Sequence, residues 1–141
     1  MTVSISKTTD IDACLALRME VFVQEQKVPV EEEVDDLDPV SVHFLAQDEE
    51  GNGIGTARVY EVGHIGKIGR VCVTKSHRGT GLGKRLIEAC LEDLRTRPHI
   101  TQAKLGAQNH AIAFYEGLGF TVIGDEYMDG GIPHHDMVRA L

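Results

Sequence analysis

Apolar residues recur at helical spacing in two long stretches of the chain. Residues 9–24 carry them every three or four positions, and Asp10 near the start is a common helix cap. The pattern is stronger between residues 82 and 94, where one face holds Leu82, Leu86, Ile87, Cys90, Leu91 and Leu94. Both stretches predict amphipathic helices, and residues 111–118 predict a third, shorter helix.

Shorter apolar runs predict strands. They fall at residues 3–5, 42–47, 54–62, 67–74, 103–107, 120–123 and 136–141. A turn-forming cluster at 48–53 joins the second and third runs into a hairpin, whereas Pro29 and Pro39 bracket an acidic segment that reads as a loop. The order β-α-β-β-β-α-β-α-β-β predicts an α/β fold with a mixed sheet whose hairpins come first.

Length and charge narrow the class of protein. A chain of 141 residues with 42% apolar residues predicts one domain, residues 1–141, with a real core. Acids outnumber bases by 22 to 14, so the net charge of −8 argues against a nucleic-acid partner and favours cationic substrates. No apolar run reaches the ~20 residues of a membrane span, and the start lacks the features of a signal peptide. We therefore expect a cytoplasmic protein without a membrane partner.

Three cysteines, Cys14, Cys72 and Cys90, are widely spaced and odd in number. This spacing predicts free, buried thiols in a reducing compartment rather than a disulfide framework. The histidines outside the candidate site show no spacing typical of ligands, so we expect no metal site; they are His43, His64, His77, His99 and His110.

A glycine-rich turn, Arg78-Gly79-Thr80-Gly81-Leu82-Gly83, lies between a predicted strand and the strongest predicted helix. Glycine lets a ligand approach the main chain closely, and the first turn of a helix offers unpaired N–H groups and a positive dipole end. With Arg78 and Lys84 nearby, this combination predicts a phosphate or pyrophosphate site. The alternative is a tight turn without a ligand. The glycine spacing fits neither a Walker loop nor a dinucleotide-binding fold.

The stretch Gly69–Gly83 resembles motif A of the GNAT family of N-acetyltransferases, whose signature Gln/Arg-x-x-Gly-x-Gly/Ala is filled by Arg78, Gly81 and Gly83. Residues 108–120 resemble motif B in order and spacing. Two further stretches, 17–26 and 130–135, are similar to the ElaA- and YjcF-like bacterial branch. The resemblance covers nearly the whole chain. It implies a mixed, mostly antiparallel sheet flanked by helices, with a pyrophosphate-binding βα turn.

The resemblance also implies how acetyl-CoA binds. The main chain of Val71, Cys72 and Val73 would pair with the pantetheine arm like an added strand. The pyrophosphate would lie on the turn formed by Arg78, Gly79, Thr80, Gly81, Leu82, Gly83 and Lys84. Relatives also contact the cofactor through an Asn before the motif B helix. Here Gln108 holds that position with Asn109 beside it, so we assign no such contact.

The implied reaction is transfer of acetyl from acetyl-CoA to a primary amine of a small molecule, by direct attack in a ternary complex. Tyr115 matches the family's general acid; the alternative is an aromatic packed in the core, a place that Phe114 could fill instead. An amino sugar or a polyamine is the candidate acceptor, and a homodimer is an open expectation. The alternative function is a catalytically silent module that binds or senses acyl-CoA.

The acceptor side is less defined. Candidates for substrate contact are Arg18, Glu25, Glu33 and His134, and for Arg18 the alternative is pairing with a nearby acid. The general base is open among Glu25, Glu33, His134 and His135. The acidic segment 31–38 is either a solvated loop or a wall of negative charge that attracts a cationic amine.

Overall fold

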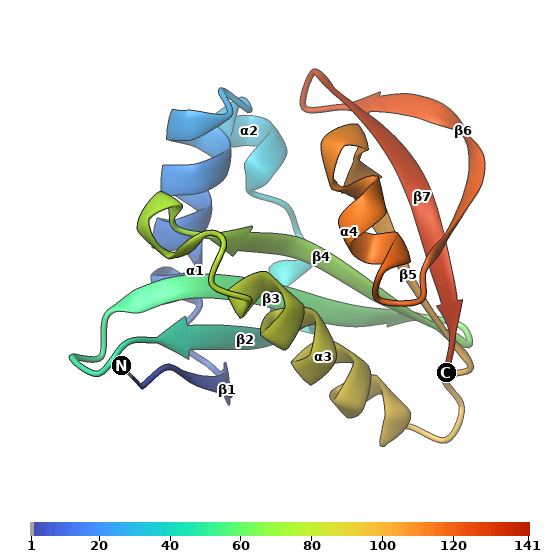
Figure 1. Ribbon diagram of the computed structural model, residues 1–141, viewed down its shortest axis with the longest axis horizontal. Coiled ribbons are helices and arrows are strands. Elements are labelled where there is room, and N and C mark those ends of the chain that lie inside the picture. The colour runs from blue at the N-terminus through green and yellow to red at the C-terminus, as the bar shows by residue number, and fades with distance from the viewer. Residues whose placement is uncertain (1) are drawn as a thin grey trace.

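The computed structural model describes residues 2–141; Met1, the first residue of the expected domain, lies outside the described residues. A seven-stranded sheet crosses the molecule in the order β1-β2-β3-β4-β5-β7-β6 (Figure 1). The strands are β1 (Ser4–Thr8), β2 (Val42–Gln47), β3 (Gly53–Val62), β4 (Ile65–Val73), β5 (Gln102–Gln108), β6 (Thr121–Asp129) and β7 (Ile132–Ala140). Neighbouring strands are antiparallel except β4 and β5, which are parallel.

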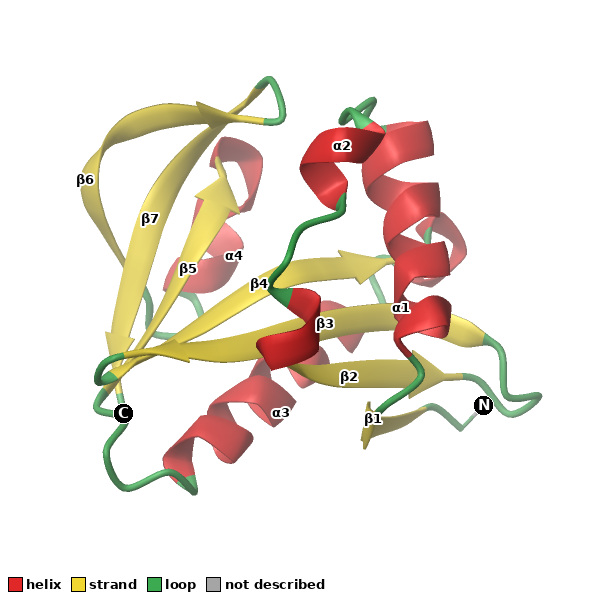
Figure 2. Cartoon of the chain, turned by 180° about the vertical axis from the view of Figure 1, so that it is seen from behind, coloured by secondary structure: helices red, strands yellow, loops and turns green. Residues whose placement is uncertain are grey.

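Helices cover the sheet on both faces (Figures 1 and 2). The α-helices are α1 (Ile11–Arg18), α2 (Val30–Glu33), α3 (Leu82–Arg95) and α4 (Ile112–Glu116). A π-helical segment, η1 (Met19–Glu25), continues α1, and three short 3-10 turns are η2 (Asp38–Val40), η3 (Lys75–His77) and η4 (Asn109–Ala111).

Each face of the sheet has its own apolar cluster. On one face Leu86 and Ile87 of α3 are fully buried in a large core that includes Val59 of β3 and Ile68 of β4. On the other face Cys14 and Leu17 of α1 pack in a smaller cluster with Leu45 and Cys72. The smaller core leaves room on the α1 face for charged groups, which form much of the site described below.

The sequence-based order of elements is confirmed. β2 has the predicted bounds, and the stretch 9–24 is helical from Ile11, where Asp10 Oδ1 accepts a hydrogen bond from the Ala13 amide at 3.1 Å. The helix changes to π geometry at Met19, which the apolar pattern does not reveal. The prediction that the three cysteines are free and buried is also confirmed.

Two parts of the prediction are wrong. The segment between Pro29 and Pro39 is not a simple loop, because it contains the single-turn helix α2 and the turn η2. The last two strands are longer than residues 120–123 and 136–141, since β6 and β7 form a long hairpin around Gly130 and Gly131, both at positive φ. Most of β6 is exposed at the sheet edge, so it lacks the apolar alternation by which strands are recognised.

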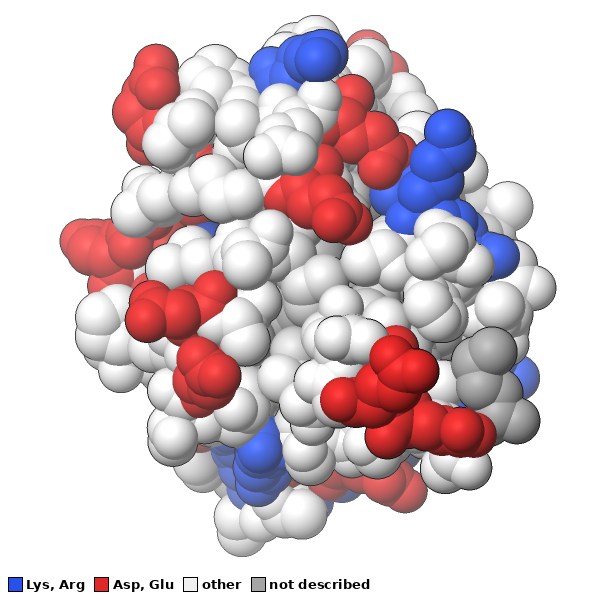
Figure 3. Space-filling view, turned by 90° about the vertical axis from the view of Figure 1, so that its left-hand side faces the viewer, with Lys and Arg blue, Asp and Glu red and all other residues white. Residues whose placement is uncertain are grey.

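Charged side chains can be followed on one face of the molecule. On the face shown in Figure 3, Asp and Glu side chains form several separate groups, with Lys and Arg toward its edges. Within residues 2–141, no helix is both long enough and apolar enough to cross a membrane.

Candidate functional site

A cleft opens where β4 and β5 separate. These strands pair over three register positions only, the last being Lys67 with Lys104. Beyond this point β5 follows β7 and β4 follows β3, so the two strands diverge (Figure 2). The resulting cleft has a volume of about 650 Å³ and is lined by residues of η1, α2, β3, β4, β5, η4, α4 and the β6–β7 hairpin.

The glycine turn lies beside this cleft, directly before α3. Gly79 and Gly81 have φ values of 77° and 84°, in the left-handed region that favours glycine. A Cβ atom built on either glycine meets nothing within 4 Å, so the main chain is open to a ligand. No side chain caps the start of α3, and its first turn carries no acid. The turn therefore has the features of a phosphate site.

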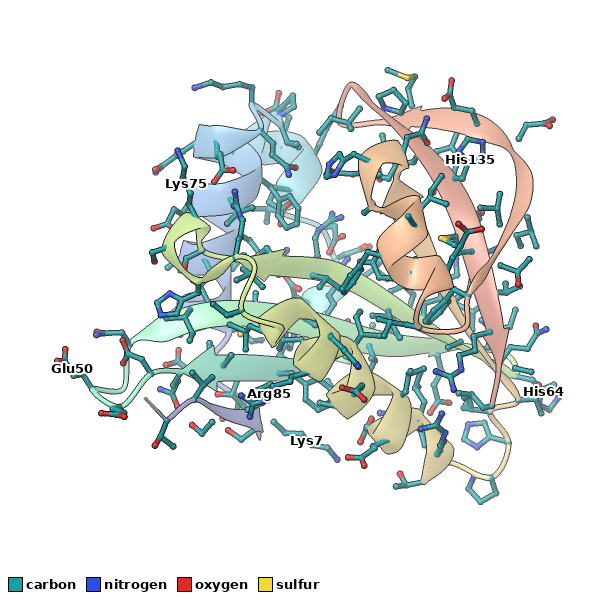
Figure 4. All side chains as sticks on the ribbon, viewed as in Figure 1. Lys7, Glu50, His64, Lys75, Arg85 and His135 are labelled. Carbon is teal, nitrogen blue, oxygen red and sulfur yellow. The ribbon has the colours of Figure 1, made fainter. Side chains whose placement is uncertain are left out.

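Arg78 links the glycine turn to the cleft. Its Nε donates to the carbonyl oxygen of Val73 at 3.1 Å, and its Nη2 donates to Glu25 Oε1 at 2.8 Å. This contact lowers the pKa of Glu25, chiefly through the hydrogen bond from Arg78. Lys75 lies at the same end of the molecule (Figure 4), and its charge also favours the Glu25 carboxylate. Positive side chains thus gather around the turn, and Glu25 is engaged by one of them.

The three β4 residues expected to pair with pantetheine, Val71, Cys72 and Val73, all line the cleft. Among residues 2–141, β4 has no strand partner on its β5 side beyond Lys67. The Cys72 side chain is buried with α1, and burial raises the pKa of its thiol to about 12. Cys72 can therefore offer the cleft its backbone but not a reactive thiolate.

Arg70 marks a bulge in β4 just before this edge. Its φ of 50° is unusual for a residue with a side chain, and the register with β3 shifts between Thr56 and Arg58. Such bulges redirect side chains and end strand pairing, and they are frequent beside active sites. Here the bulge lies at the point where β4 has left β5.

Tyr115 on α4 lines the cleft and packs edge-on against Phe114 and Phe120, with ring centroids 5.0 and 6.0 Å away. Burial raises the pKa of its phenol to about 12, so the hydroxyl keeps its proton at neutral pH. The expectation that Phe114 fills the core in its place is wrong, because Phe114 is 42% exposed while Tyr115 packs against the core. Packing and proton donation are both compatible with this position.

His134 on β7 lies in the wall opposite β4. The ring is 8% exposed and stacks on Tyr127 of β6 at a centroid distance of 5.7 Å. Its Nδ1 is 2.7 Å from the carbonyl oxygen of Ile132. Because a carbonyl oxygen can only accept, Nδ1 carries the proton of the neutral ring and Nε2 holds the lone pair. Next to it, the Tyr127 hydroxyl donates to Asp136 Oδ1 at 2.7 Å.

His135, the neighbouring candidate, does not line the cleft. Its Nδ1 contacts Asn109 Oδ1 at 2.8 Å, and Asn109 also donates to Glu126 at 2.6 Å. Successive residues of a strand point to opposite faces, which separates His135 from His134. The Asn109 side chain is therefore used outside the cleft.

Arg18 does not reach the cleft either. It is 1% exposed, and it donates from Nε to Glu33 Oε1 at 2.7 Å and from Nη1 to Asp38 Oδ1 at 2.8 Å. This geometry favours the alternative interpretation, pairing with nearby acids, and corrects the expectation of a substrate contact. Glu33 does line the cleft, but its carboxylate is held by Arg18 and Arg70. Burial raises the pKa of Glu33 in spite of these arginines.

Some acids of the segment 31–38 neutralise arginines inside the protein. Neither the solvated loop nor the wall of charge facing a substrate anticipated this role. Asp35 accepts from Arg58 Nη2 at 2.7 Å and from Arg70 Nη2 at 3.1 Å, and Asp38 also accepts from Arg58 at 2.8 Å. Three arginines thus face three acids of this segment. We call these six side chains the ion cluster: Arg18, Arg58, Arg70, Glu33, Asp35 and Asp38. Glu31, Glu32 and Asp36 remain exposed.

One further contact ties the walls of the cleft together. Gln108 Nε2 at the end of β5 donates to Gln26 Oε1, just after η1, at 2.8 Å. Sequence reasoning missed this pair and the Tyr127–Asp136 contact. For the first contact the sequence shows only a Gln at the motif B position, and for the second only polar residues near His134. Neither feature indicates which residue the side chain would contact.

Residues 10–141 match the family described as "Acetyltransferase (GNAT) domain". The chain belongs to the GNAT family. YjcF of Bacillus subtilis (strain 168), which is named an N-acetyltransferase, is 40% identical over 124 residues, 87% of each protein. Escherichia coli ElaA is 28% identical with a TM-score of 0.87 over 98% of this chain and 99% of that chain. An acyl-CoA N-acyltransferase from Pseudomonas aeruginosa is 34% identical with a TM-score of 0.86 over 99% of both chains.

These similarities confirm the resemblance to the ElaA- and YjcF-like branch and the expected GNAT fold. They support an acyltransferase that uses acyl-CoA and an amine acceptor, in preference to a silent binding module. The cleft between β4 and β5, beside the glycine turn, has room for the acyl transfer of a GNAT enzyme.

Stability of the ion cluster should depend on pH through Asp35. The hydrogen bond from Arg58, with the nearby arginine charges, holds the pKa of Asp35 down at about 2. Its contribution is therefore complete above the unfolded pKa of about 4 and is lost as pH falls toward 2. We expect Asp35→Asn to lower the free energy of unfolding at pH 7 by about 1 kcal/mol, because solvent screens part of the interaction.

Urea unfolding at pH 7 and pH 3 measures this effect, with the exposed neighbour Asp36→Asn as the matched control. The difference between Asp35→Asn and the parent should shrink at the lower pH, while Asp36→Asn stays near the parent at both. A difference that is the same at both pH values would contradict the role given to the Asp35 charge.

Proposed function

We propose that this GNAT enzyme transfers acetyl from acetyl-CoA to the primary amine of a small molecule, by direct attack within a ternary complex. The observation that supports this most is the two-sided cleft. The open β4 edge and the glycine turn lie on one side, and the polar wall of β7 with His134 lies on the other. Both reactants can therefore reach the space between β4 and β5 without a covalent enzyme intermediate.

The residues beside the cleft fit acetyl-CoA. Backbone groups of Val71, Cys72 and Val73 are available to the amides of the pantetheine arm, as in strand addition. The main chain from Gly79 to Lys84 has the space and the free amides for the pyrophosphate. When the cofactor binds, Arg78 would donate to a phosphate oxygen, either in place of Glu25 or in addition to it.

Acetyl-CoA supplies an activated acyl group, and the transfer forms a C–N bond as the C–S bond breaks. The amine must present its lone pair, so one of its protons has to leave. Backbone N–H groups along the β4 edge are the available donors for the charge that develops on the acetyl oxygen. Tyr115, protonated at neutral pH, can donate its proton to the departing sulfur.

His134 is the candidate that best fits the proton acceptor. Glu25 is bound to Arg78, Glu33 is bound to Arg18, and His135 lies outside the cleft. His134 alone among the four combines a place in the cleft wall with a lone pair at Nε2. The amine proton would move to Nε2 directly or through one water molecule.

The experiment that tests the function is release of free CoA thiol from acetyl-CoA in the presence of a panel of primary amines. An acetyltransferase releases thiol in an amount equal to the acetylated amine formed. A protein that binds acetyl-CoA but releases no thiol with any amine would instead be the silent acyl-CoA-binding module.

Acetyl-CoA should stabilise the folded protein through the glycine turn. At ~100 times its dissociation constant a ligand adds ~2.7 kcal/mol, and thermal unfolding detects this as a higher Tm. Gly81→Asp should abolish the shift, because a carboxylate would enter the phosphate site.

Gly63→Asp is a matched control, since Gly63 also has positive φ and open space around its Cβ position but lies in the β3–β4 turn. Both variants place an Asp at positive φ, so the loss of the acetyl-CoA shift, measured against the Tm of each free variant, should separate them. An equal shift in both variants would contradict the assignment of the turn.

Proton transfer should depend on Tyr115 and His134 without affecting cofactor binding. We expect Tyr115→Phe and His134→Gln each to lower kcat by ~10²–10⁴-fold, the usual range for general acid–base groups, while acetyl-CoA raises Tm as in the parent. A general base must be deprotonated, so the fall in rate toward low pH should flatten in His134→Gln.

His135→Gln controls for the loss of a histidine from β7 outside the cleft. It should keep both the rate and the pH profile of the parent. Parental rates in Tyr115→Phe would return Tyr115 to a packing role, and a parental pH profile in His134→Gln would exclude it as the base.

A further inference from the structure

Two lysines lie side by side at the closed end of the cleft. Lys67 of β4 and Lys104 of β5 are register partners, the last pair before the strands separate, and both line the cleft. Lys104 Nζ is 3.6 Å from Asp136 Oδ2, whereas Lys67 has no ion pair among residues 2–141. Like charges on directly paired positions repel each other, and a sheet gains nothing from them. The pair therefore leaves positive charge available to a ligand.

Arg58 is a further basic residue of the cleft wall. It lines the same cleft, is 4% exposed, and its guanidinium carbon lies 5.9 Å from the centre of the Tyr60 ring. Both Nη atoms of Arg58 donate to Asp35 within the ion cluster, but the buried Nε has no hydrogen-bond partner among the described residues. Tyr60 is in turn the register partner of Lys67 on β3. Because this nitrogen is buried, a ligand in the cleft does not reach it, and the anion site is carried by Lys67 and Lys104.

β7 carries the polar groups that an amine could use. Asp136 and His134 on β7 both line the cleft, and the Asp136 carboxylate is held by the Tyr127 hydroxyl and lies near Lys104 Nζ. At the closed end of the cleft, Asp136 thus compensates Lys104 only and leaves Lys67 without a counter-charge among the described residues, while the His134 imidazole also lies on β7. A polyamine has no group that would match the two lysines.

We propose that the acceptor is an amine that also carries an anionic oxygen group, a carboxylate or a phosphate, which binds Lys67 and Lys104. This inference rests on the proposed function for the amine end of the substrate. It excludes a polyamine as the preferred acceptor and favours an amino acid or an amino sugar phosphate.

Matched acceptors test the substrate class. Glucosamine and glucosamine 6-phosphate form one pair, an amino acid and its amide form another, and spermidine represents polyamines. In the thiol-release assay we expect the anionic member of at least one pair to have a kcat/KM at least tenfold higher than its neutral partner. The pair that shows the difference distinguishes a phosphate from a carboxylate. Equal values within both pairs, or a preference for spermidine, would overturn the proposal.

Variants at the two lysines test the site itself. Lys67→Met and Lys104→Met keep the length of the side chain and remove its charge, so each should raise the KM for the anionic acceptor by about tenfold, as for other hydrogen bonds to charged groups. The KM for the neutral partner and the acetyl-CoA shift in Tm should stay as in the parent. Lys7→Met is the control. Lys7 lies on the edge strand β1, away from the cleft, and pairs with Asp93 of α3.

A binding measurement separates this inference from the proposed reaction. Inorganic phosphate is titrated into the parent and the Lys67→Met/Lys104→Met double variant by NMR, with saturating CoA to occupy the glycine turn. We expect weaker phosphate binding in the variant. Equal binding would overturn the anion site whatever the activity, whereas lysine-dependent binding without acetylation of any amine would support the site and contradict the proposed function.

Discussion

β4 and β5 share three register pairs and then diverge, and the rest of the site depends on this separation. Parallel neighbours need a crossover, which α3 provides, and the turn that starts this helix therefore lies beside the opened strands. β5 is held along its whole length by β7 and β4 by β3, so neither strand can close the gap. The unpaired β4 edge and the free amides of α3 are two consequences of one topological constraint.

The ion cluster positions the other side of the cleft. Arg18 on α1, Arg58 on β3 and Arg70 on β4 hold the acids of residues 33–38, which fixes α2 against the open part of the sheet. Buried ion pairs gain little net stability over apolar packing, but loss of one partner leaves a charge unpaired. The cluster is therefore best understood as a means of holding a polar wall in one geometry beside a polar substrate.

How far the sequence predicts this structure depends on whether the signal is local. The α3 face and the glycine turn are encoded within about fifteen consecutive residues, so both could be identified, and the GNAT fold followed from motifs of the same kind. α2 could not be predicted, because Glu33 at its end is held by arginines from α1 and β4 that no local pattern connects to it.

The site shows the same limit. Whether Phe114 or Tyr115 faces the core depends on the phase in which α4 leaves the turn η4, and residue type does not reveal that phase. His134 and His135 are equivalent in sequence, and the register of β7 on β5 separates them. Lys67 and Lys104 are 37 positions apart, and their juxtaposition depends on where parallel pairing ends.

Binding of acyl-CoA along the β4 edge and the glycine turn would protect the backbone amides there. Backbone amide hydrogen exchange, measured with and without acetyl-CoA, tests this residue by residue. We expect slower exchange at residues 71–73 and 79–84 when acetyl-CoA is present, with unchanged exchange in β1 and in the β2–β3 turn at residues 48–52. Protection spread evenly over the chain, or absent from both segments, would contradict the account.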